Sequence, residues 1–230
     1  MISNSILMSM LFSDKILSYH YNLHPSMKLP DGIDWLMPYE DNETRRCMDL
    51  FYKKFYSDEK SRTYILGINP GRFGGGITGI PFTDPIRLAS VGIENSFPKR
   101  QELSSVFIYE MIKACGGPEM FYSKYYFASL SPLGFVKEGK NYNYYDDPAL
   151  AKAVRPFIIQ NIETQIRFGA GLDKVFCLGQ GKNHEYLQRL NEEYKWWKEV
   201  IPLPHPRWIM QYKLKSKEGY LNLYKDVLLL

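Results

Sequence analysis

The chain has 230 residues, of which 45% are hydrophobic and 15% aromatic, and its formal net charge at pH 7 is +4. This apolar content excludes an intrinsically disordered chain, and the length is sufficient for one sizeable hydrophobic core. The mild positive charge permits a polyanionic partner but does not by itself indicate one. Because no linker or change of composition divides the sequence, we expect a single domain over residues 1–230.

The three cysteines, Cys47, Cys115 and Cys177, are odd in number and far apart in the sequence. They indicate neither a disulfide framework nor a CxxC metal site, and we interpret them as buried thiols in a reducing cytoplasm. The apolar run over residues 6–12 has no basic segment before it and no small-residue cleavage site, so it is not typical of a signal peptide. No stretch approaches the roughly 20 apolar residues that cross a membrane, and no membrane partner is expected.

Residues 1–60 are expected to form a helical extension that packs on the rest of the domain. The apolar positions over residues 7–17 fit one face of a helix, and those over residues 43–56 fit a second, clearer helix. Between them, residues 25–38 predict an irregular connection that contains Trp35.

Short β-rich segments alternate with helical patterns along the rest of the chain. The predicted strands lie at residues 62–69, 125–128, 175–178 and 199–203. Helices are predicted over residues 101–115, over 148–166 with a kink or a restart at Pro156, after Gly181, and over 220–230. This alternation predicts a three-layer α/β/α fold with a central, mainly parallel, four-stranded sheet. Ligands bind where parallel strands end, so we expect Asn69, Ser129 and His205 to converge at one edge.

The stretch over residues 64–82 is the most distinctive part of the sequence. An apolar run ends in Asn69 and is followed by a loop, over residues 70–84, that is too rich in glycine and proline for a regular element. Glycines at such density indicate positive φ angles or the close approach of a ligand to the main chain. An ordinary surface loop is the alternative.

This loop formally matches the dinucleotide fingerprint GxGxxG at Gly74, Gly76 and Gly79. That fingerprint requires its first glycine directly after a strand and a helix through the others, whereas here the loop continues to Pro81, so we regard the match as accidental. There is no phosphate-binding P-loop, and the four histidines lack metal-ligand spacing. We therefore expect no metal and no organic cofactor.

Two other segments carry weaker signals. Residues 137–146 are polar and rich in tyrosine, and they predict a mobile surface loop. His205 lies between two prolines at a strand tip, where a neutral imidazole could donate a hydrogen bond to charge that develops on a ligand oxygen. A lone histidine is more often structural, so this chemical role needs support from other residues.

That support comes from a resemblance. The segment Gly67–Gly71 resembles the first motif of the uracil-DNA glycosylase superfamily, and its continuation through Thr78–Phe82 resembles the single-strand-selective monofunctional branch without a gap. His205-Pro206 resembles the second motif, and Ser131–Leu133 the segment between the two. The likeness runs from about Thr63 to Arg207. The mismatch-specific branch has Asn in place of His205, and the iron–sulfur branches need a cysteine cluster that this chain lacks.

The resemblance implies roles for individual residues. Asn69 would position and polarise the attacking water, and His205 would stabilise the departing base as an anion. The base-binding residues would be Phe82, which stacks on the base, together with Phe73, Gly71, Gly75 and Ser129. No nucleophilic lysine is required, so the resemblance implies a monofunctional hydrolase that leaves an abasic site in base-excision repair.

Ser129 departs from the family pattern, because the family has an asparagine that reads the uracil amide there. An asparagine side chain offers a donor and an acceptor together, whereas one hydroxyl can serve as either but not as both towards one base edge. We hypothesise that base recognition is looser in this chain and extends to deaminated purines.

The second departure is a shortened motif after His205. Residues 208–230 are expected to form a wedge segment and a C-terminal helix, after a motif-bearing core over residues 63–207. The candidate DNA-binding and wedge residues are Arg207, Trp208, Ile209, Lys213 and Lys215. The alternative is an amphipathic strand in which Trp208 and Ile209 pack on the core and the lysines share one face.

The sequence thus predicts a cytoplasmic, monomeric DNA glycosylase that acts on single-stranded or mismatched DNA containing a deaminated base. A non-catalytic module that binds damaged DNA or abasic sites remains an alternative, as does a nucleoside or nucleotide hydrolase. Asn69 and His205 argue against an inert binder, and the lysines over residues 213–217 argue against free nucleosides.

Overall fold

The computed structural model describes residues 10–229. Its centre is a four-stranded sheet in the order β3-β2-β6-β7, in which every neighbouring pair is parallel. The strands are β2 (Arg62–Gly67), β3 (Tyr125–Ser129), β6 (Ala170–Leu178) and β7 (Glu199–Leu203). The predicted fold class and all four predicted strands are confirmed, although β6 begins well before Val175.

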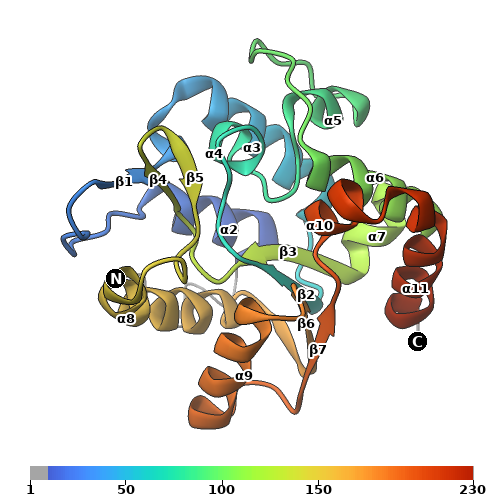
Figure 1. The fold of residues 1–230 in the computed structure, drawn as a ribbon. Coiled ribbons are helices and arrows are strands. Elements are labelled where there is room, and N and C mark those ends of the chain that lie inside the picture. Colours follow the sequence, from blue (N-terminus) through green and yellow to red (C-terminus); the bar gives the residue numbers. More distant parts are fainter. Residues whose placement is uncertain (1–9, 230) are drawn as a thin grey trace.

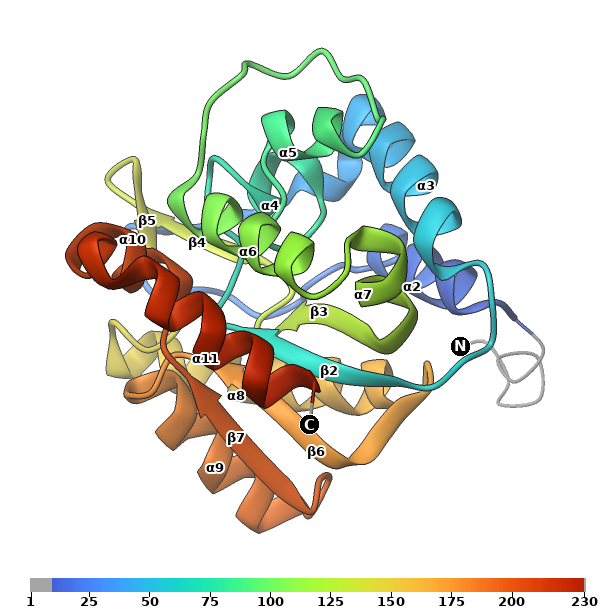
Figure 2. The ribbon, with the colours of Figure 1, turned by 90° about the vertical axis from the view of Figure 1, so that its right-hand side faces the viewer.

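Helices cover both faces of this sheet (Figures 1 and 2). One face carries α8 (Pro148–Ile166) and α9 (Lys182–Tyr194), and the other carries α6 (Leu103–Ala114), α7 (Pro118–Lys124) and α11 (Lys217–Leu229). The sheet is buried between them, and all five positions of β3 are buried. Helix α8 continues through Pro156, so this proline does not begin a new helix.

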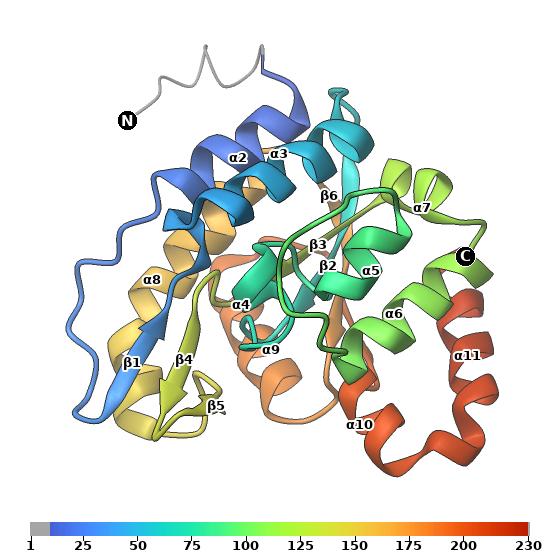
Figure 3. The same ribbon diagram turned by 90° about the horizontal axis from the view of Figure 1, so that it is seen from above.

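The N-terminal helices α2 (Phe12–Tyr21) and α3 (Asn42–Tyr56) lie side by side next to β3 (Figure 3). The ring of Phe12 meets the ring of Tyr126 edge to face at 5.3 Å, and the Tyr56 hydroxyl donates to the Tyr125 carbonyl at 3.2 Å. The expected packing of two helices on the core is therefore present. The part of the first helix that was expected before residue 10 lies outside the described residues.

A second sheet was not predicted. Strands β1 (Ile33–Leu36), β4 (Gly134–Lys137) and β5 (Lys140–Tyr142) form an antiparallel sheet in the order β1-β4-β5. Trp35 pairs with Phe135 across it, with ring centroids 5.0 Å apart. The expected irregular connection and the expected mobile loop were therefore wrong in part, because each supplies a short strand whose partner is distant in the sequence.

Short elements connect the longer helices and strands. They are η1 (Pro38–Glu40), α4 (Gly75–Thr78), α5 (Pro85–Ser90), α10 (Pro206–Tyr212) and η2 (Leu214–Ser216). Helix α4 is a single turn inside the stretch expected to be irregular. Helix α10 occupies the segment for which a strand was one alternative, so its apolar residues follow helical spacing.

Candidate active site

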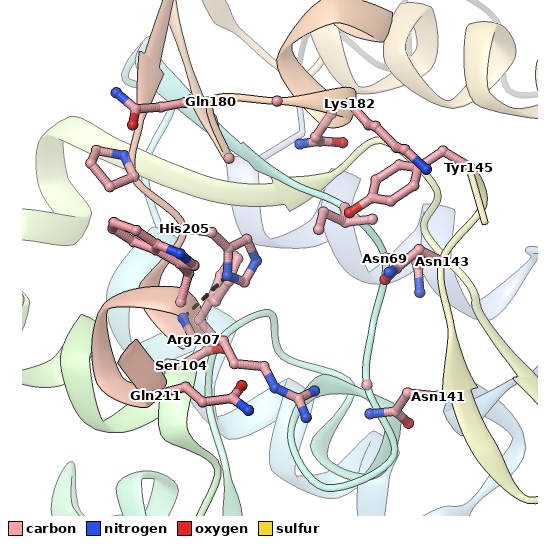
Figure 4. A pocket seen from close by; sticks show the side chains of 18 of the residues that line it. Asn69, Ser104, Asn141, Asn143, Tyr145, Gln180, Lys182, His205, Arg207 and Gln211 are labelled. Carbon is pink, nitrogen blue, oxygen red and sulfur yellow. Dashed lines mark hydrogen bonds between the residues drawn. The ribbon is translucent and has the colours of Figure 1, made fainter. Parts of the chain in front are cut away.

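The carboxyl ends of the parallel strands open into a cavity of about 600 Å³. Strand β2 leads to Asn69, β6 leads to the segment Gly179–Asn183, and β7 leads to His205; all of these residues line the cavity. Figure 4 shows the Asn69 and His205 side chains on opposite sides of its open centre. A group held between them would meet one side chain on each side.

The side-chain amide of Asn69 is oriented by the main chain at the end of β5 and just after it. Its Nδ2 donates to the Tyr142 carbonyl at 3.1 Å, and its Oδ1 accepts from the Tyr144 N–H at 3.2 Å. A backbone carbonyl can only accept and a backbone N–H can only donate, so the two bonds fix which end of the amide is oxygen. One lone pair of Oδ1 is left for a further donor, such as a water molecule.

Side chains in turn hold this segment in place. Asn141 Oδ1 accepts from the Arg72 N–H at 3.0 Å, which ties β5 to the loop after Asn69. The hydroxyl of the buried Tyr144 donates to Asn183 Oδ1 at 2.9 Å and connects the segment to α9. The segment expected to be mobile is thus anchored on two sides. The sequence offered only its repeated Asn-Tyr pairs as a signal, and these did not reveal backbone partners for Asn69.

His205 is the N-cap of α10, and its ring has a defined tautomer. Nδ1 accepts from the Arg207 N–H at 3.1 Å, so the neutral imidazole carries its proton on Nε2. Burial and, to a smaller extent, the charge of Arg207 lower the pKa of His205 to about 4. At neutral pH the ring is therefore an uncharged hydrogen-bond donor.

Phe82 lines the same cavity and is held in a strained conformation. Its φ of 55° lies in the left-handed region, which costs a non-glycine residue about 1–2 kcal/mol. Its ring rests on the backbone of Gly67, where a Cβ atom would lie 2.6 Å from Phe82 Cζ. The buried hydroxyl of Thr78 donates to the Thr83 carbonyl at 2.7 Å and fixes the turn around Phe82.

The glycines of the loop are needed mainly because backbone atoms approach one another closely, and less because of unusual φ angles. A Cβ atom at Gly76 would lie 2.7 Å from the Gly71 carbonyl oxygen, which accepts the Gly76 N–H at 3.0 Å in a tight turn. Gly71 lines the large cavity, whereas Gly75 and the buried Ser129 line a separate cavity of about 10 Å³. Ser129 therefore reaches the expected edge of the sheet but lies beside the main pocket.

Phe73 takes a different place from the one implied by the family resemblance. It is absent from the lining of the large cavity, and its ring contacts Arg100 and Arg72, whose guanidinium carbons lie 3.5 and 5.0 Å from its centroid.

The expected wedge residues separate into two groups. Ile209 is fully buried and belongs to the core, whereas Trp208 is 40% exposed and lines the cavity together with Arg207. Tyr212 and Leu214 lie within the same expected wedge segment and are 66% and 57% exposed. Helical spacing in α10 turns Ile209 inward and leaves Tyr212 outward, whereas Leu214 follows in η2.

The expected phosphate-binding lysines are both exposed. Lys213 extends over the Trp208 ring, with Nζ 5.5 Å from the centroid, and Lys215 lies in η2. The third lysine of this segment, Lys217, is engaged in an ion pair with Glu110 at 2.6 Å.

One carboxyl group also lines the pocket. Glu102 packs against Gly74, where a Cβ atom would lie 2.2 Å from Oε2, and it accepts a hydrogen bond from the Ser105 hydroxyl at 2.9 Å. Burial, together with the nearby charge of Asp84, raises the pKa of Glu102.

The part of the chain that the structure describes contains neither a metal-binding cluster nor a membrane-spanning helix. Across residues 10–229, no group of three or more His, Cys, Asp or Glu side chains is arranged to hold a metal ion. No helix within the same residues is long and apolar enough to cross a membrane.

Comparisons with known proteins agree with this geometry. Residues 54–228 match the family model of the Uracil DNA glycosylase superfamily. The crystal structure of wild-type SMUG2 from Pedobacter heparinus is similar, with 48% sequence identity and a TM-score of 0.93, over 95% of this chain and 97% of that chain. No curated protein sequence is significantly similar.

The chain therefore belongs to the uracil-DNA glycosylase superfamily. The similarity to SMUG2 supports its assignment to the SMUG-like branch of that superfamily, as the sequence motifs predicted.

Proposed function

We propose that the pocket receives a uracil flipped out of DNA and that Asn69 and His205 promote hydrolysis of its N-glycosidic bond. As a superfamily member in the SMUG-like branch, the chain is a monofunctional uracil-DNA glycosylase of base-excision repair. The observation that carries the residue roles is the pairing of an oriented amide with a neutral imidazole donor across one cavity.

The two side chains act on opposite ends of the breaking bond. Water held by the free lone pair of Asn69 Oδ1 attacks C1′ of the sugar, and the bond from C1′ to the base nitrogen breaks. The electron pair leaves with the base, whose developing negative charge accepts a hydrogen bond from His205 Nε2. The water proton passes to solvent and the base anion later takes up a proton, so the products are an abasic site and free base.

The remaining pocket residues position the base. Phe82 offers a ring that is fixed by Gly67 and by the turn around it, and stacking on a preformed surface loses little entropy. Main-chain groups of Gly71 crowd one edge of the base, and Gly75 acts from the neighbouring small cavity. Phe73 does not contact the flipped base in this proposal.

Base recognition at Ser129 is looser than an asparagine would make it. The hydroxyl is buried beside Gly75 and lies 3.5 Å from a Cβ atom at Gly67, so it reaches the region below Phe82 as a single group. One hydroxyl adapts to a donor or an acceptor, which favours acceptance of deaminated purines as well as uracil.

DNA binds as a single strand or at a mismatch, because flipping a base costs less where it is unpaired. Tyr212 and Leu214 are the exposed apolar groups that fill the vacated space, and Lys213 and Lys215 contact phosphates. The protein acts as a monomer in the cytoplasm, where the three buried free cysteines stay reduced.

The proposal is tested with end-labelled oligonucleotides that carry uracil, hypoxanthine or xanthine, in single strands and opposite guanine or adenine. Wild-type protein is expected to release free base, with strand breaks only after alkali and with the fastest release from single strands. Ser129→Ala should change the ratio of rates between the bases. Strict uracil specificity in both proteins would contradict the role of Ser129, and strand breaks without alkali would contradict a monofunctional reaction.

A further inference from the structure

Two arginines flank one aromatic ring at the rim of the pocket. The guanidinium carbon of Arg100 lies 3.5 Å from the centroid of the Phe73 ring, and that of Arg72 lies 5.0 Å from it. The cavity is lined by Gly71, which directly precedes Arg72, and by Glu102, which follows Arg100 by two positions. This arginine cluster (Arg72, Phe73 and Arg100) therefore adjoins the place where the reaction occurs but does not enter it.

A residue of β5 holds one member of the cluster in place. Asn141 Oδ1 accepts from both the backbone N–H of Arg72, at 3.0 Å, and its Nε–H, at 3.2 Å. Asn141 belongs to β5 and itself lines the cavity. Because Phe73 and Asn141 restrict the rotamers of these long side chains, less conformational entropy is lost when they bind a ligand.

The two charges have no counterion within the described part of the chain. Across residues 10–229, the ion pairs of arginine are those of Arg46, Arg62, Arg87 and Arg155, and neither Arg72 nor Arg100 belongs to one. Stacking on Phe73 occupies the face of the Arg100 guanidinium, which leaves its N–H edges for hydrogen bonds in the plane of the group. Planar edges of this kind match the oxygens of a phosphate.

We propose that Arg72 and Arg100 bind a backbone phosphate of the substrate strand next to the flipped nucleotide, with Phe73 as their support. This inference rests on the proposed action on DNA and extends it to a second contact point. Asn141 and Gln211 of α10 lie on different sides of the pocket in Figure 4. A strand that touches both the lysines after α10 and the arginine cluster is held at two points while its base is turned inward.

The first test compares two charge-matched variants on a uracil-containing single strand. Arg100→Gln is expected to raise KM about tenfold and to change KM more than kcat. It should also make the slope of log Kobs against log salt concentration shallower by about 0.7, the value for one phosphate of a single strand. The control Arg167→Gln removes the same charge from an exposed residue just before β6, at the opposite edge of the sheet, and should leave KM unchanged. Equal KM values and equal salt dependence of binding in the two variants would overturn the proposal.

The second test locates the phosphate. Oligonucleotides with one neutral methylphosphonate at successive positions around the uracil are bound to Asn69→Ala protein, with and without Arg100→Gln. One position is expected to weaken binding about tenfold in the first protein and to have no further effect in the second. Additive losses at every position would overturn the proposal. Because this readout needs no turnover, it still decides the matter if the proposed chemistry fails.

Discussion

Replacement of Asn69 by aspartate changes one atom type and tests how the amide is held. An aspartate keeps the acceptor for the Tyr144 N–H, but its second oxygen then faces the carbonyl oxygen of Tyr142, at the 3.1 Å now spanned by a hydrogen bond. The carbonyl of Pro70, 3.4 Å from the same atom, adds a second repulsive contact. The carboxylate must rotate away from its productive orientation or take up a proton.

The cost follows from the bond that is lost. A buried acceptor that loses its donor and meets another oxygen costs about 1–3 kcal/mol, which corresponds to a fall in kcat of roughly 5- to 150-fold at pH 7.5. A protonated carboxyl restores the donor to Tyr142, so the activity of Asn69→Asp should recover as the pH falls towards 5. His205 does not interfere in this range, since its pKa is about 4.

The assay is single-turnover release of uracil between pH 5 and 8. Asn143→Asp is the matched control, because it places the same charge on the pocket lining without touching the two bonds of the Asn69 amide. A rate of Asn69→Asp that equals wild type at pH 7.5, or that follows the pH profile of Asn143→Asp, would refute the argument that Tyr142 and Tyr144 orient the amide.

Three further outcomes are expected. Gly67→Ala places a Cβ atom 2.6 Å from Phe82 Cζ, so it should lower kcat/KM at least about tenfold in steady-state assays, whereas Gly219→Ala, with open space around it, should not. Tyr144→Phe removes a buried hydroxyl bond and should lower Tm by about 2–4 °C in thermal unfolding; an unchanged Tm would contradict the anchoring role. Burial lowers the pKa of His20 to about 4, so His20 takes up a proton in the unfolded state, but not in the folded state, as the pH falls below 6.5. The free energy of unfolding should therefore fall by about 2–3 kcal/mol by pH 4. His20→Gln should flatten that loss in urea titrations, and an unchanged slope would assign it to other groups.

The parallel sheet was predictable because its strands are locally marked. Residues 125–128 and 175–178 are short apolar or aromatic runs between helical patterns, and burial on both faces requires such runs. Their shared direction then places Asn69 and His205 at one edge without knowledge of any contact. Membership of the family followed from the motifs around these two residues.

The antiparallel sheet and the partners of Asn69 were not predictable in the same way. Strands β1 and β5 are four and three residues long, and their partner β4 lies far from β1 in the sequence. The groups that hold Asn69 are a main-chain carbonyl and a main-chain N–H, which every such residue possesses. Sequence composition carries no information about backbone groups, so only the fold could identify Tyr142 and Tyr144.

The sequence left the burial of Ile209 open for a related reason. Trp208 and Ile209 are adjacent and both bulky, so composition treats them alike, whereas in α10 adjacent residues point about 100° apart. Ile209 therefore enters the core, whereas Tyr212 lies on the exposed side. Whether this segment is a strand or a helix had to be known before the exposure of its side chains could be predicted.

The most direct test of the account is the single-turnover rate of uracil release from a single-stranded oligonucleotide by wild type, Asn69→Ala and His205→Ala at pH 7.5. We expect release by wild type and a loss of at least about 100-fold in each variant, because one side chain orients the water and the other stabilises the leaving base. Substrate binding by both variants should remain within a few-fold of wild type. Release at the wild-type rate by either variant, or no release by wild type from any deaminated base, would contradict it.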